Sequence, residues 1–257
     1  MWDTIILDPM INSLLLIYDF LGNNFGIAII VFTTIIRLVT FPLTAQQLRS
    51  TQKMQELQGS KKWKDIEKKY KDDKQKLQEA QMKIYQEMGI NPLSGCLPML
   101  IQFPIIIGLY QGIIRALAAT PMQLLDLAKH LYDFVPRSLV PLNSDFLWMD
   151  LSAPERLFLP FLPDFGIPVL AVFVVITTYL STKMTTPPAT GGQSQQMTQV
   201  MGLYMPLLLG YLAYSYASGL ALYFVVSNLL QIVQNLAMGR ANLSNIFKRK
   251  QSAGSDS

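Results

Sequence analysis

The sequence predicts an all-α integral membrane protein with five transmembrane helices, and two observations support this fold class. Of the 257 residues, 51% are hydrophobic and only 15% are charged, whereas a soluble domain carries roughly 25% charged residues. Long apolar windows recur along the chain, at residues 24–44, 97–118, 166–183 and 200–238. One membrane-spanning helix needs about 20 such residues. The last window is long enough for two helices, joined by a turn at Ala217-Ser218-Gly219.

The first 23 residues predict an amphipathic helix that lies in the membrane interface. They are apolar but are interrupted by Asp3, Asp8, Pro9 and Asp19. They lack the basic start and the small-residue cleavage site of a secretory signal peptide. An interrupted apolar stretch of this kind suits the interface better than the bilayer core, and a sixth span is the alternative.

Charged residues outside the apolar windows predict the orientation. Residues 45–91 contain 11 Lys and Arg against 7 Asp and Glu, and residues 239–257 are also basic. Residues 116–165 contain 3 basic residues against 6 acids, and residues 1–23 contain no basic residue. Basic loops remain in the cytoplasm, so we expect the N-terminus outside and the C-terminus in the cytoplasm. The basic side suits anionic lipid headgroups or RNA equally.

These observations divide the chain into an ordered set of segments. We expect an interfacial helix at 1–23, transmembrane helix 1 at 24–44, a cytoplasmic coiled-coil hairpin at 45–91, transmembrane helix 2 at 92–118, an extracytoplasmic segment at 119–165, transmembrane helix 3 at 166–183, a cytoplasmic loop at 184–199, transmembrane helices 4 and 5 within 200–238, and a basic cytoplasmic tail at 239–257.

The hairpin prediction rests on a narrow apolar seam at helical spacing, which is typical of a two-helix coiled coil. Its members are Trp63, Ile66, Tyr70, Leu77, Ala80 and Ile84. We place the turn between the two arms at Lys71–Asp73, where Asp72 and Gln75 have the spacing of a capping box. A turn at Gly59-Ser60 would leave arms of very unequal length, and a solvated charged loop is the remaining alternative.

Arg37 is the only charged residue between Asp19 and Arg49, and it lies near the middle of that window. A guanidinium that faces lipid costs at least about 2.5–3.5 kcal/mol, and deprotonation does not relieve it. Helical spacing places Thr33 and Thr40 on the same face. Because no Asp or Glu lies inside any apolar window, a water-filled pocket is the least costly place for this charge.

Other polar residues inside the windows are candidates for the same pocket. They are Gln102 in the second span and Asn228 and Gln231 in the fifth. Each of them fits a polar cavity and, equally, an interhelical hydrogen bond with no further role.

Four stretches, in order along the chain, resemble the YidC/Oxa/Alb family of membrane protein insertases. They read "IIRLVTFPLTAQQLRSTQKM", "YKDDKQKLQEAQMKIYQEMGINPLSGCLPMLIQFPI", "LWMDLSAPE" and "MPLLLGYLAYSYASGLALYFVVSNLLQIVQN". The resemblance implies a five-helix core with a hydrophilic groove that opens to cytoplasm and lipid and is closed on the outer side. It implies the short bacterial type, which has no large outer domain, in the cell membrane.

The resemblance also assigns site residues. Arg37 and Thr33 fall on the groove arginine and threonine of the family, and Phe103, Ile106 and Phe224 fall on positions that line the substrate path. Relatives often carry tyrosine at the position of Phe224. Here the hydroxyl is on the adjacent residue, Tyr223.

The expected function is that of an insertase and chaperone, which moves nascent hydrophobic segments from the cytoplasm into the bilayer through a hydrated, positively charged groove. The expected partners are nascent membrane proteins, the ribosome, signal recognition particle or its receptor, the Sec translocon and membrane lipids, but not DNA.

We expect no enzymatic activity and no cofactor. Cys96 and His130 are the only residues of their types, which excludes an internal disulfide and leaves no cluster for a metal or for a hydrolase. A small-solute or ion-coupled transporter is the alternative function. Such proteins usually show internal repeats and an intramembrane acid, and neither is visible in the sequence.

Overall fold

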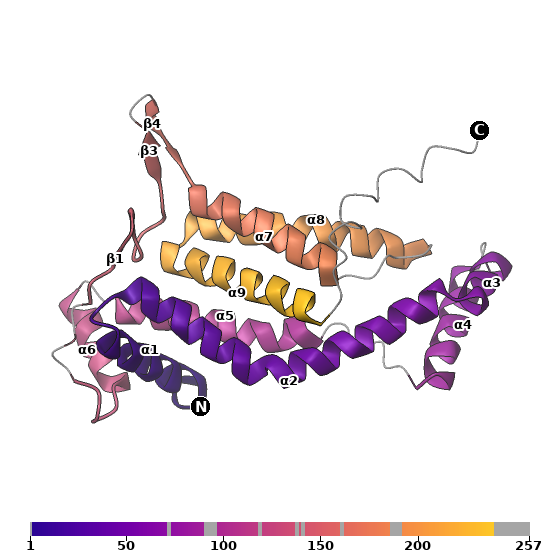
Figure 1. The fold of residues 1–257 in the computed structure, drawn as a ribbon, viewed down its shortest axis with the longest axis horizontal. Helices are drawn as coiled ribbons and strands as arrows, with labels where there is room; N and C mark the ends of the chain where they lie inside the picture. Colours follow the sequence, from indigo (N-terminus) through magenta and orange to yellow (C-terminus); the bar gives the residue numbers. More distant parts are fainter. Residues whose placement is uncertain are drawn as a thin grey trace.

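Helices dominate the computed structural model, which describes residues 2–70, 73–89, 97–117, 120–136, 139, 142–159, 162–185 and 192–238. This confirms the prediction of a mostly helical protein. Long helices run side by side as a bundle (Figure 1). They are α2 (Phe25–Gly59), α5 (Leu97–Ala116), α7 (Val169–Thr185), α8 (Gly192–Ser215) and α9 (Ser218–Ala237).

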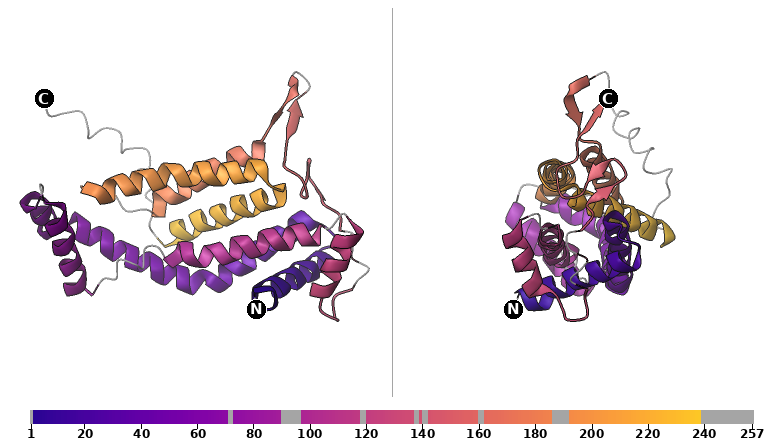
Figure 2. Two further views of the ribbon diagram at one scale, coloured as in Figure 1. Left: turned by 180° about the vertical axis from the view of Figure 1, so that it is seen from behind. Right: turned by 90° about the vertical axis from the view of Figure 1, so that its left-hand side faces the viewer.

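Short elements gather at the two ends of this bundle (Figure 1). One end, which we name the hairpin end, carries α3 (Lys61–Lys69) and α4 (Lys74–Glu87). The opposite end, named the loop end, carries the remaining elements, which are η1 (Asp3–Leu7), α1 (Asp8–Phe20), α6 (Pro121–His130), β1 (Asp145–Phe146), β2 (Met149–Asp150), β3 (Leu157–Leu159) and β4 (Leu162–Ile167). Figure 2 shows the same arrangement from behind and from the loop end.

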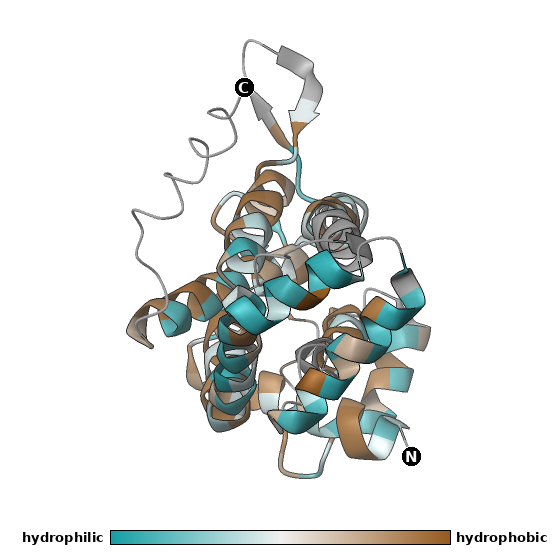
Figure 3. Ribbon diagram, turned by 90° about the vertical axis from the view of Figure 1, so that its right-hand side faces the viewer, coloured by the Kyte–Doolittle hydropathy of each residue, from teal (hydrophilic) through white to brown (hydrophobic). Residues whose placement is uncertain are grey.

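The outward faces of the bundle are apolar. Exposed fractions reach 72% for Val39 on α2, 51% for Phe173 on α7, 65% for Tyr211 on α8 and 61% for Val233 on α9. A soluble monomer rarely exposes apolar patches of this extent. Among the described residues, α2 and α9 are long and apolar enough to cross a membrane, and Phe103–Ala116 and Val169–Met184 are shorter apolar helices. Figure 3 shows hydrophilic residues on the helices of the hairpin end.

The first long helix continues past its apolar part without interruption. α2 runs to Gly59, and Ser60 then caps α3 by accepting a hydrogen bond from the backbone N–H of Trp63. The chain therefore breaks at Gly59-Ser60, the position that the sequence analysis rejected as the turn of the hairpin, as well as between α3 and α4. The first break changes direction between two helices in series.

The reversal between α3 and α4 lies close to the predicted turn, but a different residue caps α4. Asp73 accepts a hydrogen bond of 3.1 Å from the backbone N–H of Lys76, which replaces the expected Asp72–Gln75 box; Asp72 lies outside the described residues. The bonds from the backbone and the side chain of Lys76 lower the pKa of Asp73. An anionic side chain at this position also complements the helix dipole.

The hairpin has a small core of its own, separate from that of the bundle. Trp63 and Ile84 are buried together with Leu57 of α2. The rings of Trp63 and Tyr85 lie 5.3 Å apart, and the indole N–H donates to Glu67 at 3.0 Å. Of the predicted seam, Trp63, Ile66 and Ile84 belong to this core, together with residues from the last turns of α2.

The N-terminal helix packs against the bundle. Its buried residues repeat at helical spacing on one face, and they are Leu7, Ile11, Leu14, Leu15 and Tyr18. Asn12 fastens this helix to the segment after α6, since its amide donates to the carbonyl of His130 at 2.7 Å and accepts from the backbone N–H of Tyr132 at 2.8 Å. Its predicted interfacial position stays a prediction.

The segment that contains β1 and β2 docks on the start of α9. The hydroxyl of Ser218 donates to the carbonyl of Asp150 at 2.7 Å, and its backbone N–H donates to the carbonyl of Ala153 at 2.8 Å. The backbone N–H of Gly219 donates to the carbonyl of Leu151 at 3.1 Å. These bonds satisfy N–H groups that a helix start leaves without a partner inside the helix. A Cβ at Gly219 would lie only 3.2 Å from the Leu151 oxygen.

The same segment caps α7 through a buried carboxylate. Glu155 is 6% exposed. One of its oxygens accepts from the indole N–H of Trp148 at 3.1 Å, and the other accepts from the backbone N–H of Leu170 at 3.0 Å. Since Leu170 is the second residue of α7, the charge lies at the positive end of that helix.

We expect Trp63→Ala to loosen the hairpin and to leave the bundle intact. Truncating a buried Trp costs about 3–5 kcal/mol, and the hairpin core is separate from the main core. Limited proteolysis should show faster cleavage within residues 60–89, at an unchanged melting temperature for the bundle. Lys64→Ala, at an exposed position of the same helix, is the control. A comparable loss of stability in the bundle would contradict the separation of the two cores.

Glu155→Ala should destabilise the loop end. The change leaves the backbone N–H of the buried Leu170 without its acceptor, and an unpaired buried donor costs about 1–3 kcal/mol; the exposed Trp148 loses a bond as well. The melting temperature should fall by roughly 2–4 °C per kcal/mol for a chain of this size. Asp145→Ala, an exposed acid in the same segment, should have little effect, and equal melting temperatures for the two variants would refute the capping role.

Candidate functional site

Arg37 lies on α2 and reaches across to α9. Its Nε donates to the hydroxyl of Ser227 at 3.1 Å, and one terminal nitrogen donates to the same hydroxyl and to Oε1 of Gln231 at 3.4 Å. Ser227 and Gln231 are four residues apart, so they lie on one face of α9. The described residues include no ion pair to Arg37, and its partners named here are neutral.

These contacts only partly offset the charge. Neutral hydroxyl and amide dipoles solvate a guanidinium, but they leave its net charge of +1 uncompensated. A carboxylate carries the opposite charge and can accept two parallel hydrogen bonds from one guanidinium, which neutral hydroxyl and amide acceptors do not offer. The site around Arg37 is therefore chemically suited to an anion. The sequence predicts a hydrated pocket at this position; the structure shows interhelical bonds, and the hydration stays a prediction.

The polar part of α2, α7 and α9, which we name the polar layer, begins near the level of Arg37. α2, α7 and α9 all begin at the loop end (Figure 1), and each begins with apolar buried residues and then changes to polar ones roughly 12–14 Å along its axis. The apolar members are Phe25, Ile29 and Phe32 on α2, Leu170 and Val174 on α7, and Leu220 to Phe224 on α9. The polar members are Thr33 and Gln47, then Thr177, Thr178 and Ser181, then Ser227, Gln234 and Asn235.

Asn228 belongs to this layer but faces a different helix from its neighbour Ser227. Its side-chain amide donates to the hydroxyl of Thr178 at 2.8 Å and to that of Thr177 at 3.3 Å. Both threonines lie on α7 and are 5% exposed. The predicted site residue Asn228 is thus bonded to α7, whereas Arg37 is bonded to Ser227 and Gln231.

The predicted threonines flank Arg37 but bond to their own helix. The hydroxyl of Thr33 donates to the carbonyl of Ile29 at 2.6 Å, and that of Thr40 donates to the carbonyl of Ile36 at 2.8 Å. Each such bond leaves the oxygen lone pairs of the hydroxyl free to accept. Thr33 is buried and Thr40 is partly exposed.

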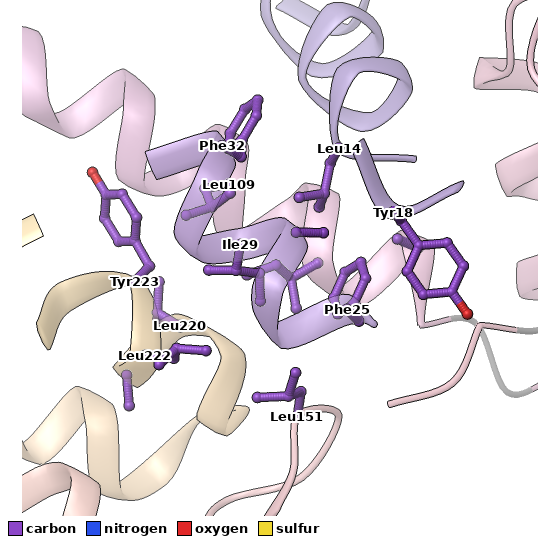
Figure 4. Close-up of a cluster of buried hydrophobic side chains, with 14 of the residues drawn as sticks. Leu14, Tyr18, Phe25, Ile29, Phe32, Leu109, Leu151, Leu220, Leu222 and Tyr223 are labelled. Carbon is purple, nitrogen blue, oxygen red and sulfur yellow. The ribbon is translucent and has the colours of Figure 1, made fainter. Parts of the chain in front are cut away.

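The predicted aromatic residues of α9 lie in the apolar cluster on the loop-end side of the polar layer. Tyr223 is 2% exposed and Phe224 is 4% exposed, and their ring centroids are 5.7 Å apart. Figure 4 shows Tyr223 extending from α9 on the side of the cluster where Leu109 and Phe32 lie. Neither ring lies on the surface.

The predicted residues of α5 are more accessible. Phe103 is 48% exposed, and Ile106, one turn further, is partly buried against the core. The side chain of Gln102 lies outside the described residues. The structure thus brings Arg37, Ser227, Gln231 and Asn228 into one layer, with the aromatic residues beside it.

Three residues of this layer were not predicted from the sequence, namely Ser227, Thr177 and Thr178. A single serine inside an apolar window carries little signal, although Ser227 precedes Asn228 and lies four residues before Gln231. The paired hydroxyls in "ITTYLST" of α7 were a clearer sign, because several hydroxyls on one span commonly bond to a neighbouring helix.

Within the described residues, no group of His, Cys, Asp and Glu could hold a metal ion. The loop end carries two further features. An open cavity of about 630 Å³ lies between α5 and α6. Beside it, Nη1 of Arg115 contacts Nε2 of His130 at 2.7 Å, and Nδ1 of His130 contacts Asp8 at 2.6 Å. These contacts join α1, α5 and α6 at the end opposite to the hairpin (Figure 1).

Comparison with known proteins gives one consistent result. The family described as 60Kd inner membrane protein matches residues 16–245. The chain is 34% identical over 256 residues to Membrane protein insertase YidC 1 of Listeria monocytogenes, which covers 97% of this chain and 74% of that protein. It is 31% identical over 244 residues to Membrane protein insertase YidC of Oceanobacillus iheyensis, covering 93% of this chain and 84% of that protein.

A solved structure agrees with these relatives. The crystal structure described as an active YidC insertase with its first transmembrane domain resolved is similar to this fold, with a TM-score of 0.53 and 31% sequence identity. The similarity covers 84% of this chain and 42% of the solved chain.

Proposed function

Because this chain belongs to the YidC family of membrane protein insertases, we propose that it inserts nascent hydrophobic segments through a groove centred on Arg37. The observation that carries the proposal is the permanent charge of Arg37 inside the apolar bundle, held by the neutral side chains of Ser227 and Gln231. An acidic or polar segment of a substrate is the natural ligand of such a charge.

The physical task of an insertase is to move the polar flank of a substrate helix across hydrocarbon. A polar layer inside the inner half of the bilayer shortens that crossing. The guanidinium attracts an acidic tail and exchanges Ser227 and Gln231 for a carboxylate, which is the stronger acceptor. Ser227 and Gln231 remain beside Arg37, so the guanidinium can bond to them again when the tail leaves.

Apolar surface supplies the driving force for exit. The apolar part of the substrate meets the exposed Phe103 first, then Ile106, and burial in lipid contributes about 0.8 kcal/mol per CH₂. Phe224 is buried beside Tyr223 in the resting structure, so a substrate reaches it only when the neighbouring helices part. This step requires neither covalent chemistry nor a nucleotide.

The proposed orientation places the hairpin end in the cytoplasm and the loop end outside, with five passes of the chain. The side-by-side helices and the gathering of short elements at two ends support it (Figure 1), as does the excess of basic residues at 45–91. In that orientation α3 and α4 face the ribosome and the targeting machinery, and the docked segment from Asp150 to Glu155 lies over the outer ends of α7 and α9.

Cysteine labelling tests the topology. With Cys96 changed to Ser, single cysteines at Gln193 and at Ser144 should react from opposite sides of the membrane, because Gln193 lies in the first turn of α8, at the hairpin end, and Ser144 lies in the loop-end segment. An impermeant maleimide added to intact cells should label only the cysteine at position 144. Labelling of both positions from outside would overturn the five-pass arrangement.

The charge of Arg37 is tested with paired substrates that have acidic or neutral translocated tails. Arg37→Lys should retain substantial activity, since a lysine keeps the charge. Arg37→Ala should reduce insertion of the acidic substrate by roughly ten- to a hundredfold, the equivalent of one charged hydrogen bond. The neutral substrate should be affected much less, because the lost interaction is an attraction between opposite charges.

Thermal stability separates this role from a purely structural one. Arg37→Ala removes bonds to Ser227 and Gln231, but a helical serine can bond to its own helix instead, so the melting temperature should fall only slightly. Equal loss for both substrates, together with a large drop in melting temperature, would reject the groove-charge mechanism.

A further inference from the structure

Asn228 does not contact Arg37, but it lies next to a residue that does. It follows Ser227 directly, and successive residues of an α-helix point about 100° apart. One residue therefore serves the contact of α9 with α2, through Arg37, and the next serves the contact with α7, through Thr177 and Thr178.

The rotation of α9 about its own axis is fixed at two levels. At the loop end, Ser218 and Gly219 bond to the backbone of the segment from Asp150 to Ala153. Ten residues further, about 15 Å along the helix, Asn228 bonds to the two threonine hydroxyls of α7. The apolar contacts between these two levels are non-directional and constrain rotation less tightly than the hydrogen bonds do.

We propose that Asn228 is a positioning residue for the groove arginine, and that its bond to Thr178 holds α9 at the rotation that presents Ser227 and Gln231 to Arg37. The proposal rests on the proposed role of Arg37 in binding acidic substrate segments. In this role Asn228 supports the site and does not itself contact the substrate.

The tolerance of the arrangement is small. Side-chain tips of a helix lie roughly 5 Å from its axis, so a rotation of about 30° moves them by roughly 2.5 Å. The Nε–Oγ distance between Arg37 and Ser227 is 3.1 Å, and hydrogen bonds are lost within about 0.5 Å beyond that distance. Loss of the Asn228 bonds thus allows α9 to turn far enough to release the guanidinium.

The test compares insertion of acidic-tailed and neutral-tailed substrates by Asn228→Ala. Insertion of the acidic substrate should fall by roughly three- to tenfold, the effect of losing one interhelical hydrogen bond in a membrane, and the neutral substrate should be spared. Thr178→Val, which removes the stronger acceptor at similar volume, should reproduce this pattern. In an Arg37→Ala background, Asn228→Ala should add no further loss for the acidic substrate.

Two controls separate positioning from general destabilisation. Leu229→Ala changes the next residue of α9, which is 48% exposed on the outward face, and should affect neither substrate. Leu220→Ala truncates a residue of α9 that is 4% exposed. It should lower the melting temperature and reduce insertion of the acidic and the neutral substrate equally. The exchange of Asn228→Thr together with Thr178→Asn rebuilds a bond between α7 and α9 and should restore insertion of the acidic substrate.

The outcomes distinguish this inference from the function on which it rests. Additive losses from Asn228→Ala and Arg37→Ala, or an Asn228→Ala defect equal for both substrates, would overturn the positioning role while leaving that of Arg37 intact. If Arg37→Ala reduces insertion of acidic-tailed and neutral-tailed substrates equally, the proposed role of Arg37 itself is rejected. Failure of the exchange variant to recover the acidic substrate while it folds normally would also count against the bond between Asn228 and Thr178.

Discussion

Arg37 carries a permanent charge inside a largely apolar bundle, and the polar side chains that α9 presents to it answer this constraint. A guanidinium cannot shed its proton as a lysine or a carboxyl can, so the protein must surround it with dipoles or water. The hydroxyl of Ser227 and the amide of Gln231 are the dipoles that the structure supplies. Both come from α9, which makes the placement of that helix a condition for keeping the charge in the membrane.

The placement of α9 depends in turn on contacts at two depths. At the loop end, the segment from Asp150 to Glu155 bonds to the first backbone N–H groups of α9 and α7, so polar groups that would be orphaned at a helix start are satisfied by a single loop. Deeper in the bundle, Asn228 bonds to the hydroxyls of Thr177 and Thr178. Between these levels the core is apolar.

The division into an apolar half and a polar half gives the bundle a direction. The apolar cluster, which includes Tyr223 and Phe224 (Figure 4), is packed at the loop end, where a polar segment would gain nothing by entering. The polar layer around Arg37 lies nearer to the hairpin end. A bundle of this kind favours polar segments that approach from one side only, as the proposed insertion of cytoplasmic substrates requires.

The sequence by itself determined the helical class, the positions of the apolar windows and the isolated charge of Arg37, because hydropathy and helical period are local properties of the chain. It also identified the seam through Trp63 and Ile84 for the same reason. Which side chains meet across helices was decided only by the tertiary structure. The bonds of Arg37 to Ser227, of Asn228 to α7 and of Glu155 to the start of α7 join residues 190, 50 and 15 positions apart, and each depends on which helices are neighbours and on how each is rotated. Those two quantities follow from the packing of the whole bundle, and no local pattern encodes them.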